Sequence, residues 1–295
     1  NTGNLAKGQA GLEGGHLFIM GAAGPPANHV ILTQPTYYKG ATHIDTNATL
    51  QLGDGTPGNS RAVRVRPNVK NTTLVDGTHS TSRGNGSILT PGTGDGTGTN
   101  SIVGVATNLV INNGQLIVNN VVGALDGIAQ TTLSHISGVG SVTQMGSAPL
   151  TLLGPNTYSG GTTVAAGTLF VGADTSLGTG ALTNNGKLAT TVTQHAINVV
   201  GAFSQGAAGT LSLNAGGTGA TAAIDAIKVN ARATLGGTLV INAAAEFAPA
   251  VGQKFVVVQA AGGVTGTFSS VTVNGGATKF ITGYDATTAF VTVSP

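Results

Sequence analysis

The 295-residue chain contains no cysteine and no tryptophan, and only 7% of its residues are charged. The lack of cysteine excludes disulfide and thiolate chemistry. Because hydrophobic residues make up 40%, the composition also excludes an intrinsically disordered chain, which is more charged and less apolar. Aromatic residues amount to only 4%, which leaves little surface for stacking sugar rings.

Charge and hydropathy give no support for a nucleic-acid partner or a transmembrane segment. The formal net charge of +2 is too small to indicate a nucleic-acid partner. No apolar run approaches the length of a transmembrane helix. The N-terminus also lacks the basic and apolar parts of a signal peptide, so an export signal would be already removed or encoded upstream.

Glycine is abundant, with 48 residues, but it does not occur at every third position, which excludes collagen. Instead, a short phrase recurs: a small residue, a spacer, and an apolar or alternating strand. Its ten copies begin at Gly15, Ala48, Gly86, Gly114, Gly140, Gly167, Gly186, Gly209, Gly237 and Gly266. Intervals of this size are typical of solenoid coils, and ten phrases predict ten to twelve coils.

The most regular stretch is 150–180. It contains three short apolar runs, Leu150–Leu153, Thr162–Val164 and Thr168–Val171, separated by glycine, asparagine or proline. β-Branched and alternating runs between such breaks predict three strands. We expect Leu169 and Val171 to point inward and Phe170 outward. One such unit cannot bury its own apolar face, so further units must stack on it.

Residues 156–164 and 167–172 resemble the passenger-associated repeat (autotransporter-associated β-strand repeat) of bacterial autotransporters. The resemblance implies an all-β fold: a right-handed, single-stranded parallel β-helix. It also implies secretion with the protein's own translocator barrel as partner, and a final location outside a Gram-negative cell or on its outer membrane. A degenerate copy, in which 38–44 parallels 158–164 and 48–53 parallels 167–172, predicts the same strands near the N-terminus.

The residue composition changes along the chain and predicts two parts. Residues 1–224 are predicted to form β-helix coils, with a loop-rich excursion around 53–100 that contains two glycine-rich segments. Residues 225–295 hold half of the phenylalanines and tyrosines. An aromatic-rich end suits a cap, because the last coil has an unpaired edge. This end resembles the pertactin-like, or autochaperone, segment of autotransporters, which implies a passenger separated from its translocator and a folding nucleus at this end.

Residues that could carry chemistry are scattered. The six histidines are never within four residues of each other, so no local metal pair exists. The only glutamates are Glu13 and Glu246, and many aspartates sit beside glycine, which favours turns over paired-carboxylate hydrolysis. No nucleophile elbow is present. We therefore expect no catalytic residue, no metal and no cofactor; calcium dependence stays open.

One local cluster of charged residues does occur, and it is basic: it contains Arg61, Arg64, Arg66 and Lys70. Arg64 and Arg66 alternate with valines, so they would share one side of a strand. One interpretation is a patch for an anionic ligand such as sulfated glycan, lipopolysaccharide or acidic protein. The other is a solvated strand face that protects a sheet edge.

These features predict a non-catalytic structural or adhesive rod. It would present loops to an extracellular protein or glycan of a host, a matrix or a neighbouring cell. One alternative is a glycan-active β-helix enzyme with acids and aromatics along a groove. Another is a self-associating subunit of an extracellular filament or layer, because open solenoid ends can pair.

Overall fold

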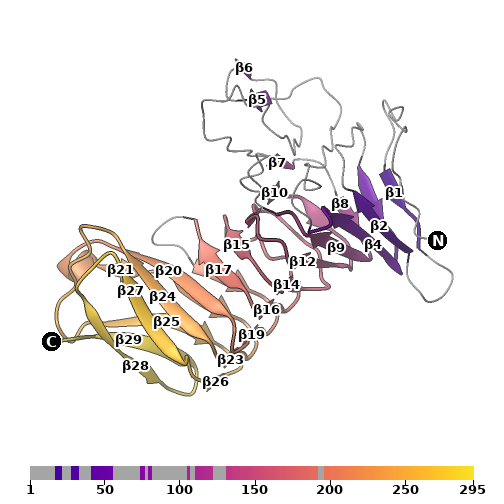
Figure 1. Cartoon of the computed structure of the whole chain (residues 1–295). Coiled ribbons are helices and arrows are strands. Elements are labelled where there is room, and N and C mark those ends of the chain that lie inside the picture. The colour runs from indigo at the N-terminus through magenta and orange to yellow at the C-terminus, as the bar shows by residue number, and fades with distance from the viewer. Residues whose placement is uncertain are drawn as a thin grey trace.

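The structure is a computed structural model that describes residues 17–21, 28–32, 41–55, 74–76, 79–81, 105–106, 110–121, 131–191 and 196–295. Over these residues the chain winds into stacked coils, and most strands pair in parallel with the coil before and the coil after (Figure 1). This arrangement confirms the predicted parallel β-helix. Among the described residues, no helix has the length and apolar character needed to cross a membrane.

Sheet II, as we name it here, runs along the whole described rod and contains nine parallel strands. In spatial order these are β2 (Asn28–Leu32), β4 (Ala48–Leu52), β9 (Gln115–Val118), β12 (Ser141–Gln144), β14 (Thr162–Val164), β16 (Leu182–Asn184), β19 (Phe203–Gln205), β23 (Ala233–Leu235) and β26 (Val264–Gly266). At about 4.8 Å between neighbours, nine strands extend over about 40 Å. Within the described residues the stack is thus shorter than the ten to twelve coils predicted.

Sheet III forms the next side of the coils. Its parallel strands, in chain order, are β7 (Val105–Ala106), β10 (Thr131–Leu133), β13 (Leu150–Leu152), β15 (Thr168–Val171), β17 (Lys187–Thr190), β20 (Thr210–Gly216), β24 (Thr238–Ala243) and β27 (Ser270–Asn274). The short β21 (Ala223–Ile224) joins β20 in antiparallel orientation, just after the 3₁₀-helix η1 (Gly219–Thr221). As predicted, Leu169 and Val171 of β15 are buried and Phe170 between them is not.

Sheets I and IV occupy the third side of the coils, at opposite ends of the rod. Sheet I contains β1 (Leu17–Ile19), β3 (Thr42–Ile44), β8 (Val110–Asn112) and β11 (Ile136–Ser137). Sheet IV contains β18 (Ala196–Val199), β22 (Ala226–Val229), β25 (Lys254–Ala260), β29 (Thr288–Ser294) and β28 (Lys279–Tyr284). Between them, two coils keep ladder-like hydrogen bonds without regular strands: Thr157 donates to Ile136 and Thr179 donates to Tyr158.

The recurring phrase occurs once in each of the nine coils counted by the strands of sheet II, as predicted, but it does not mark one side of the coil. Strands after Ala48, Gly114 and Gly140 lie in sheet II, those after Gly167, Gly186, Gly209 and Gly237 lie in sheet III, and that after Gly15 lies in sheet I. The phrase at Gly86 falls outside the described residues. A small residue before an apolar strand suits any corner of a coil, because every corner packs backbone against backbone.

The two strands of the degenerate copy form as predicted, but each lies on a different side of the rod from its counterpart in the repeat. Thr42–Ile44 belongs to sheet I, whereas its expected counterpart Thr162–Val164 belongs to sheet II; likewise Ala48–Leu52 is in sheet II and Thr168–Val171 is in sheet III. The short strands Thr42–Ile44 and Thr162–Val164 share one burial pattern, with a partly exposed residue between two buried ones. The alternation therefore identifies a strand but not its side of the rod.

Coil length changes along the chain. In the repeat region Val142 pairs with Thr162 and Thr162 with Leu182, so successive coils there have the same length. Toward the C-terminus the coils are longer, since Phe203 pairs with Ala233. The largest step joins β4 directly to β9. The hairpin strands β5 (Leu74–Asp76) and β6 (His79–Thr81) lie in this interval and pair with each other.

The core is a set of inward columns with one residue per coil. In sheet III the column contains Leu150, Leu169, Leu188, Leu211 and Leu239, all fully buried. Sheet II carries amides inside as well: the Gln144 side chain donates to the carbonyls of Gly146 (2.7 Å) and Ala148 (2.9 Å). Buried amides of this kind satisfy the corner backbone that no sheet can reach.

The C-terminal end departs from the parallel pattern. β29 pairs antiparallel with both β25 and β28, so sheet IV ends in a hairpin (Figure 1). Phe247, Phe255 and Phe280 form a cluster with ring centroids 6.1–6.4 Å apart. The backbone N–H of Phe268 donates to the Tyr284 hydroxyl at 3.0 Å. The antiparallel hairpin and the aromatic cluster provide the cap-like end that the aromatic residues predicted.

Candidate binding surface

The asparagine and tyrosine of the sequence repeat are interior residues. The Asn156 side chain accepts from the Ile136 N–H (2.9 Å) and donates to the carbonyls of Leu153 (2.8 Å) and Ser176 (2.7 Å). It thereby joins its own coil to the coils before and after. Asn156 therefore holds the coils together and is not presented to a ligand.

Tyr158 has the same interior role. Its ring is fully buried, and its hydroxyl is 2.5 Å from the Thr162 hydroxyl, which also donates to the Leu177 carbonyl at 3.3 Å. Burial raises the pKa of Tyr158 far above its ordinary value, and the hydrogen bond with Thr162 opposes that shift only in part. Tyr158 is thus a neutral structural group at physiological pH.

Three histidines of the described part of the chain have ring or hydrogen-bond contacts with other residue types. His43 stacks on Phe18, with ring centroids 4.5 Å apart. His29 is hydrogen-bonded to Gln51 at 3.1 Å, and His135 to Ser134 at 2.9 Å. Across the residues that the structure describes, no three histidine, aspartate or glutamate side chains gather into a metal-binding group.

The basic cluster predicted as a polyanion patch cannot be placed. Arg61, Arg64, Arg66 and Lys70 all lie outside the described residues. They belong to the stretch of sequence between β4 and β9. The polyanion interpretation therefore stays a prediction.

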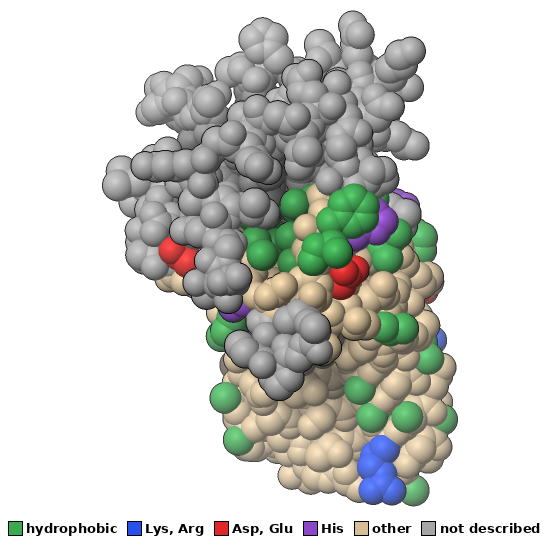
Figure 2. Space-filling view, turned by 90° about the vertical axis from the view of Figure 1, so that its right-hand side faces the viewer, with side chains coloured by type: hydrophobic (Ala, Val, Ile, Leu, Met, Phe, Trp, Pro, Cys, Tyr) green, Lys and Arg blue, Asp and Glu red, His purple; other side chains and the backbone are tan. Residues whose placement is uncertain are grey.

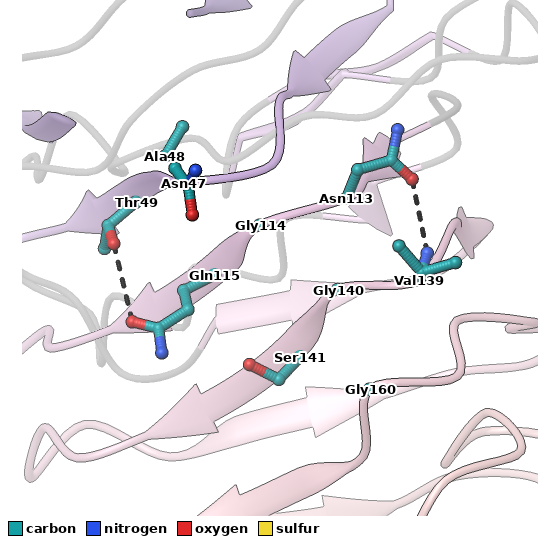
Figure 3. Close-up of a pocket in the computed structure, with 10 residues that line it drawn as sticks. All are labelled: Asn47, Ala48, Thr49, Asn113, Gly114, Gln115, Val139, Gly140, Ser141 and Gly160. Atoms are coloured by element: carbon teal, nitrogen blue, oxygen red, sulfur yellow. Dashed lines mark hydrogen bonds between the residues drawn. The ribbon is translucent and has the colours of Figure 1, made fainter. Parts of the chain in front are cut away.

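A groove of about 400 Å³ crosses the corner between sheets I and II (Figure 3). It is lined by ten residues from four successive coils: Asn47, Ala48, Thr49, Asn113, Gly114, Gln115, Val139, Gly140, Ser141 and Gly160. The lining thus combines amide and hydroxyl side chains with bare backbone, and it contains no charged side chain. The groove runs along the rod, across the strands.

Glycine creates the floor of this groove. A Cβ on Gly114 would lie 2.1 Å from the Ala48 carbonyl oxygen, and one on Gly140 would lie 2.3 Å from that of Gly114. Backbones of successive coils therefore touch at this corner, and no side chain rises from it. The polar walls come from the neighbouring positions on the same coils.

Hydrogen bonds between coils hold the walls. The Thr49 hydroxyl donates to the Gln115 side-chain oxygen at 3.4 Å, and the Val139 N–H donates to the Asn113 side-chain oxygen at 3.2 Å (Figure 3). Both bonds leave the side-chain NH₂ groups of Gln115 and Asn113 as donors. Val139, which is 63% exposed, adds an apolar rim.

Sequence reasoning did not identify this groove. Its lining residues extend in sequence from Asn47 to Gly160 and become neighbours only when the coils stack. A signal does exist: an asparagine immediately precedes the small residue and the strand in both Asn47-Ala48 and Asn113-Gly114. Asparagine tolerates the left-handed backbone that Asn47 adopts (φ 57°).

The outer face of sheet II carries a ladder of hydroxyl side chains. In register, one residue per coil, it contains Thr143, Thr163, Thr183, Ser204, Thr234 and Thr265. The last two hydroxyls are 3.3 Å apart. The ladder lies on the same sheet as the groove but outside its lining, so it offers matched positions for control substitutions.

The surface of the rod carries few charges over the described residues. In the face shown by Figure 2, tan and green side chains cover most of the lower part of the molecule, and blue and red are confined to small spots. This agrees with the low share of charged residues in the sequence. Uncharged groups of the backbone and of polar and hydrophobic side chains therefore dominate what this face offers to a partner.

Together these features define a parallel β-helix whose described surface carries few charges and whose repeat asparagine and tyrosine are buried inside. Residues 142–171 match the family model described as passenger-associated-transport-repeat. No curated protein matches the chain. The match supports the interpretation of the chain as an autotransporter passenger domain with such repeats, as the residues predicted. It implies secretion or display by a Gram-negative bacterium and association with the protein's own translocator.

Proposed function

We propose that this chain is a non-catalytic passenger that serves as an adhesive rod on the cell surface. The rod holds binding segments at a fixed distance from the cell and binds an extracellular protein or glycan by surface contact. The passenger repeat at 142–171 supports the location, and the buried Asn156 and Tyr158 of the repeat support a scaffold role for the coils.

The observation that carries the proposal is the continuity of the stack across its largest insertion. Thr42 pairs with Val110 in sheet I, and Thr49 pairs with Gln115 in sheet II. Both sheets therefore continue in register although the partners lie far apart in sequence. A rigid scaffold that tolerates an insertion between two coils suits the display of variable binding segments.

The inserted sequence supplies a ligand-binding element in this proposal. It contains Arg61, Arg64, Arg66 and Lys70, one third of all lysines and arginines of the chain. A local positive charge on an otherwise weakly charged rod attracts polyanions such as sulfated glycans. The attraction falls as salt screens it.

The test is retention of the full chain on immobilised heparin over a salt gradient. A variant with Arg61→Ser, Arg64→Ser and Arg66→Ser should elute at clearly lower salt than the parent. The matched control replaces three exposed lysines of the rod, Lys187, Lys228 and Lys279, by serine and removes the same charge. Equal retention of parent and arginine variant, or an equal loss in both variants, contradicts a binding role for the cluster.

A further inference from the structure

We propose that the corner groove between sheets I and II binds a linear neutral saccharide whose chain lies along the rod. The inference rests on the proposed surface role, since such a ligand is met outside the cell. It assigns a second binding site, at a place and with a chemistry different from those of the basic cluster.

The first argument is the lining. Asn113, Gln115 and Ser141 present two amides and a hydroxyl to the groove, and no charged side chain lines it (Figure 3). Amides and hydroxyls both donate and accept hydrogen bonds, as the hydroxyl groups of a sugar require. A sulfated or phosphorylated ligand would find no countercharge here, so the lining favours a neutral chain.

The second argument is the floor. Gly114, Gly140 and Gly160 leave the backbone of successive coils uncovered, so a flat ring can approach closely. A Cβ at Gly160 would lie 2.5 Å from the Gly140 carbonyl carbon, so glycine at this position lets the two coils stack in close contact and form a rigid floor. Close packing on a rigid floor with a few placed polar groups is the usual form of a small-ligand site.

The third argument is the repeat. The groove takes one set of lining residues from each coil, at about 4.8 Å per coil, so four coils span about 14 Å. One coil step is close to the length of one pyranose unit in an extended chain. Successive sugars can therefore meet equivalent positions, with Thr49, Gln115 and Ser141 following one another in register.

The walls are ordered before a ligand arrives. The bond from Thr49 to Gln115 and that from the Val139 N–H to Asn113 fix both amide side chains. Fixed side chains lose little conformational entropy on binding, which favours affinity. The exposed Val139 on the rim offers an apolar contact for the carbon face of a sugar ring.

The test measures binding of cellohexaose, xylohexaose and chitohexaose to the full chain by isothermal titration calorimetry. We expect at least one of these probes to bind, and a Gln115→Ala/Ser141→Ala variant to bind it at least tenfold more weakly. The matched control, Thr163→Ala/Thr183→Ala, changes the same outer face of sheet II outside the groove and should bind as the parent does.

A second variant distinguishes a loss of binding contacts from a loss of folding. Gln115→Glu keeps the side-chain volume and removes the amide donor, so it should weaken the same probe while its melting temperature stays near that of the parent. Absence of binding by all three probes, or an equal affinity in groove and control variants, overturns the inference. Heparin retention of the Gln115→Ala/Ser141→Ala variant, whose charge is unchanged, should remain at the parental salt concentration, which separates this site from the basic cluster.

Discussion

At the residue scale, the polar groups that matter most for this fold are buried. Tyr158 and Asn156 lie inside the coils and have hydrogen-bond partners there, so their conservative replacement should alter stability rather than ligand binding. Leaving a buried polar partner without its hydrogen bond is more costly than the bond itself is favourable. The repeat motif is therefore best tested by unfolding experiments.

We expect Tyr158→Phe to lower the free energy of unfolding by about 1 kcal/mol at pH 7, since one buried hydrogen bond is lost. The pH dependence has a defined sign. Burial raises the pKa of Tyr158 in the folded state, so the folded protein keeps this proton while the unfolded chain loses it above about pH 10. Stability from Tyr158 is thus complete below pH 10 and falls as pH rises further.

The measurement is urea unfolding of parent and variant between pH 7 and pH 11. The advantage of the parent should shrink above pH 10 and reverse near pH 11, at a limiting slope of about 1.4 kcal/mol per pH unit. Other titrating groups cancel in the difference between the two proteins. A difference that is constant with pH would show that Tyr158 is not buried as a neutral phenol.

At the element scale, the corners limit the sequence more strictly than the strands do. Strands accept threonine, leucine, phenylalanine or alanine inside, as the column from Thr162 through Leu182 and Phe203 to Ala233 shows. Corners instead need residues that fit between backbones of adjacent coils. Gly161 combines a positive φ of 89° with a neighbouring coil close above it.

Gly161→Ala should therefore destabilise the rod by more than the roughly 1–2 kcal/mol that a left-handed alanine costs. A Cβ there would lie 2.7 Å from the Ala181 carbonyl oxygen. Gly252→Ala is the matched control, because Gly252 has a similar φ of 83° with nothing within 4 Å of its added Cβ. Thermal unfolding of both variants gives the comparison; equal losses would show that coil contact adds nothing at Gly161.

At the scale of the whole molecule, the C-terminal end carries two of the three seven-residue strands among the described residues, together with the cluster of Phe247, Phe255 and Phe280. β25 and β29 each span seven residues, whereas β14 and β16 in the repeat region span three. The last strand of the chain, β29, pairs with β25 on one side and with β28, its partner in the hairpin, on the other. In a solenoid, folding can begin where the local core is best and then propagate.

We predict that the C-terminal segment is the stability nucleus. Truncation after Lys228 removes the hairpin and the aromatic cluster, and should give a chain that folds slowly or stays sensitive to protease. Deletion of residues 1–100 should leave a protease-resistant core. Limited proteolysis of both chains beside the parent provides the measurement; resistance of the truncated chain together with digestion of the N-terminal deletion would place the nucleus at the other end.

The sequence alone determined the fold class and the facing of individual side chains. Alternation in Thr168–Val171 placed Leu169 inside and Phe170 outside, because side chains of a strand alternate between its two faces. Glycine at the corners and the repeat motif indicated stacked coils. The aromatic residues of 225–295 indicated the closing end. These features depend on contacts within one coil or on composition.

Tertiary structure alone decided which side of the rod each strand occupies, how long each coil is, and where the groove forms. The same burial pattern appears in Thr42–Ile44 and Thr162–Val164, yet the two strands lie in different sheets. Sheet partners can be close in sequence or, as with Thr49 and Gln115, separated by a long insertion. A local pattern does not record the length of the path between coils, so the neighbours of Gln115 are defined only once the coils stack.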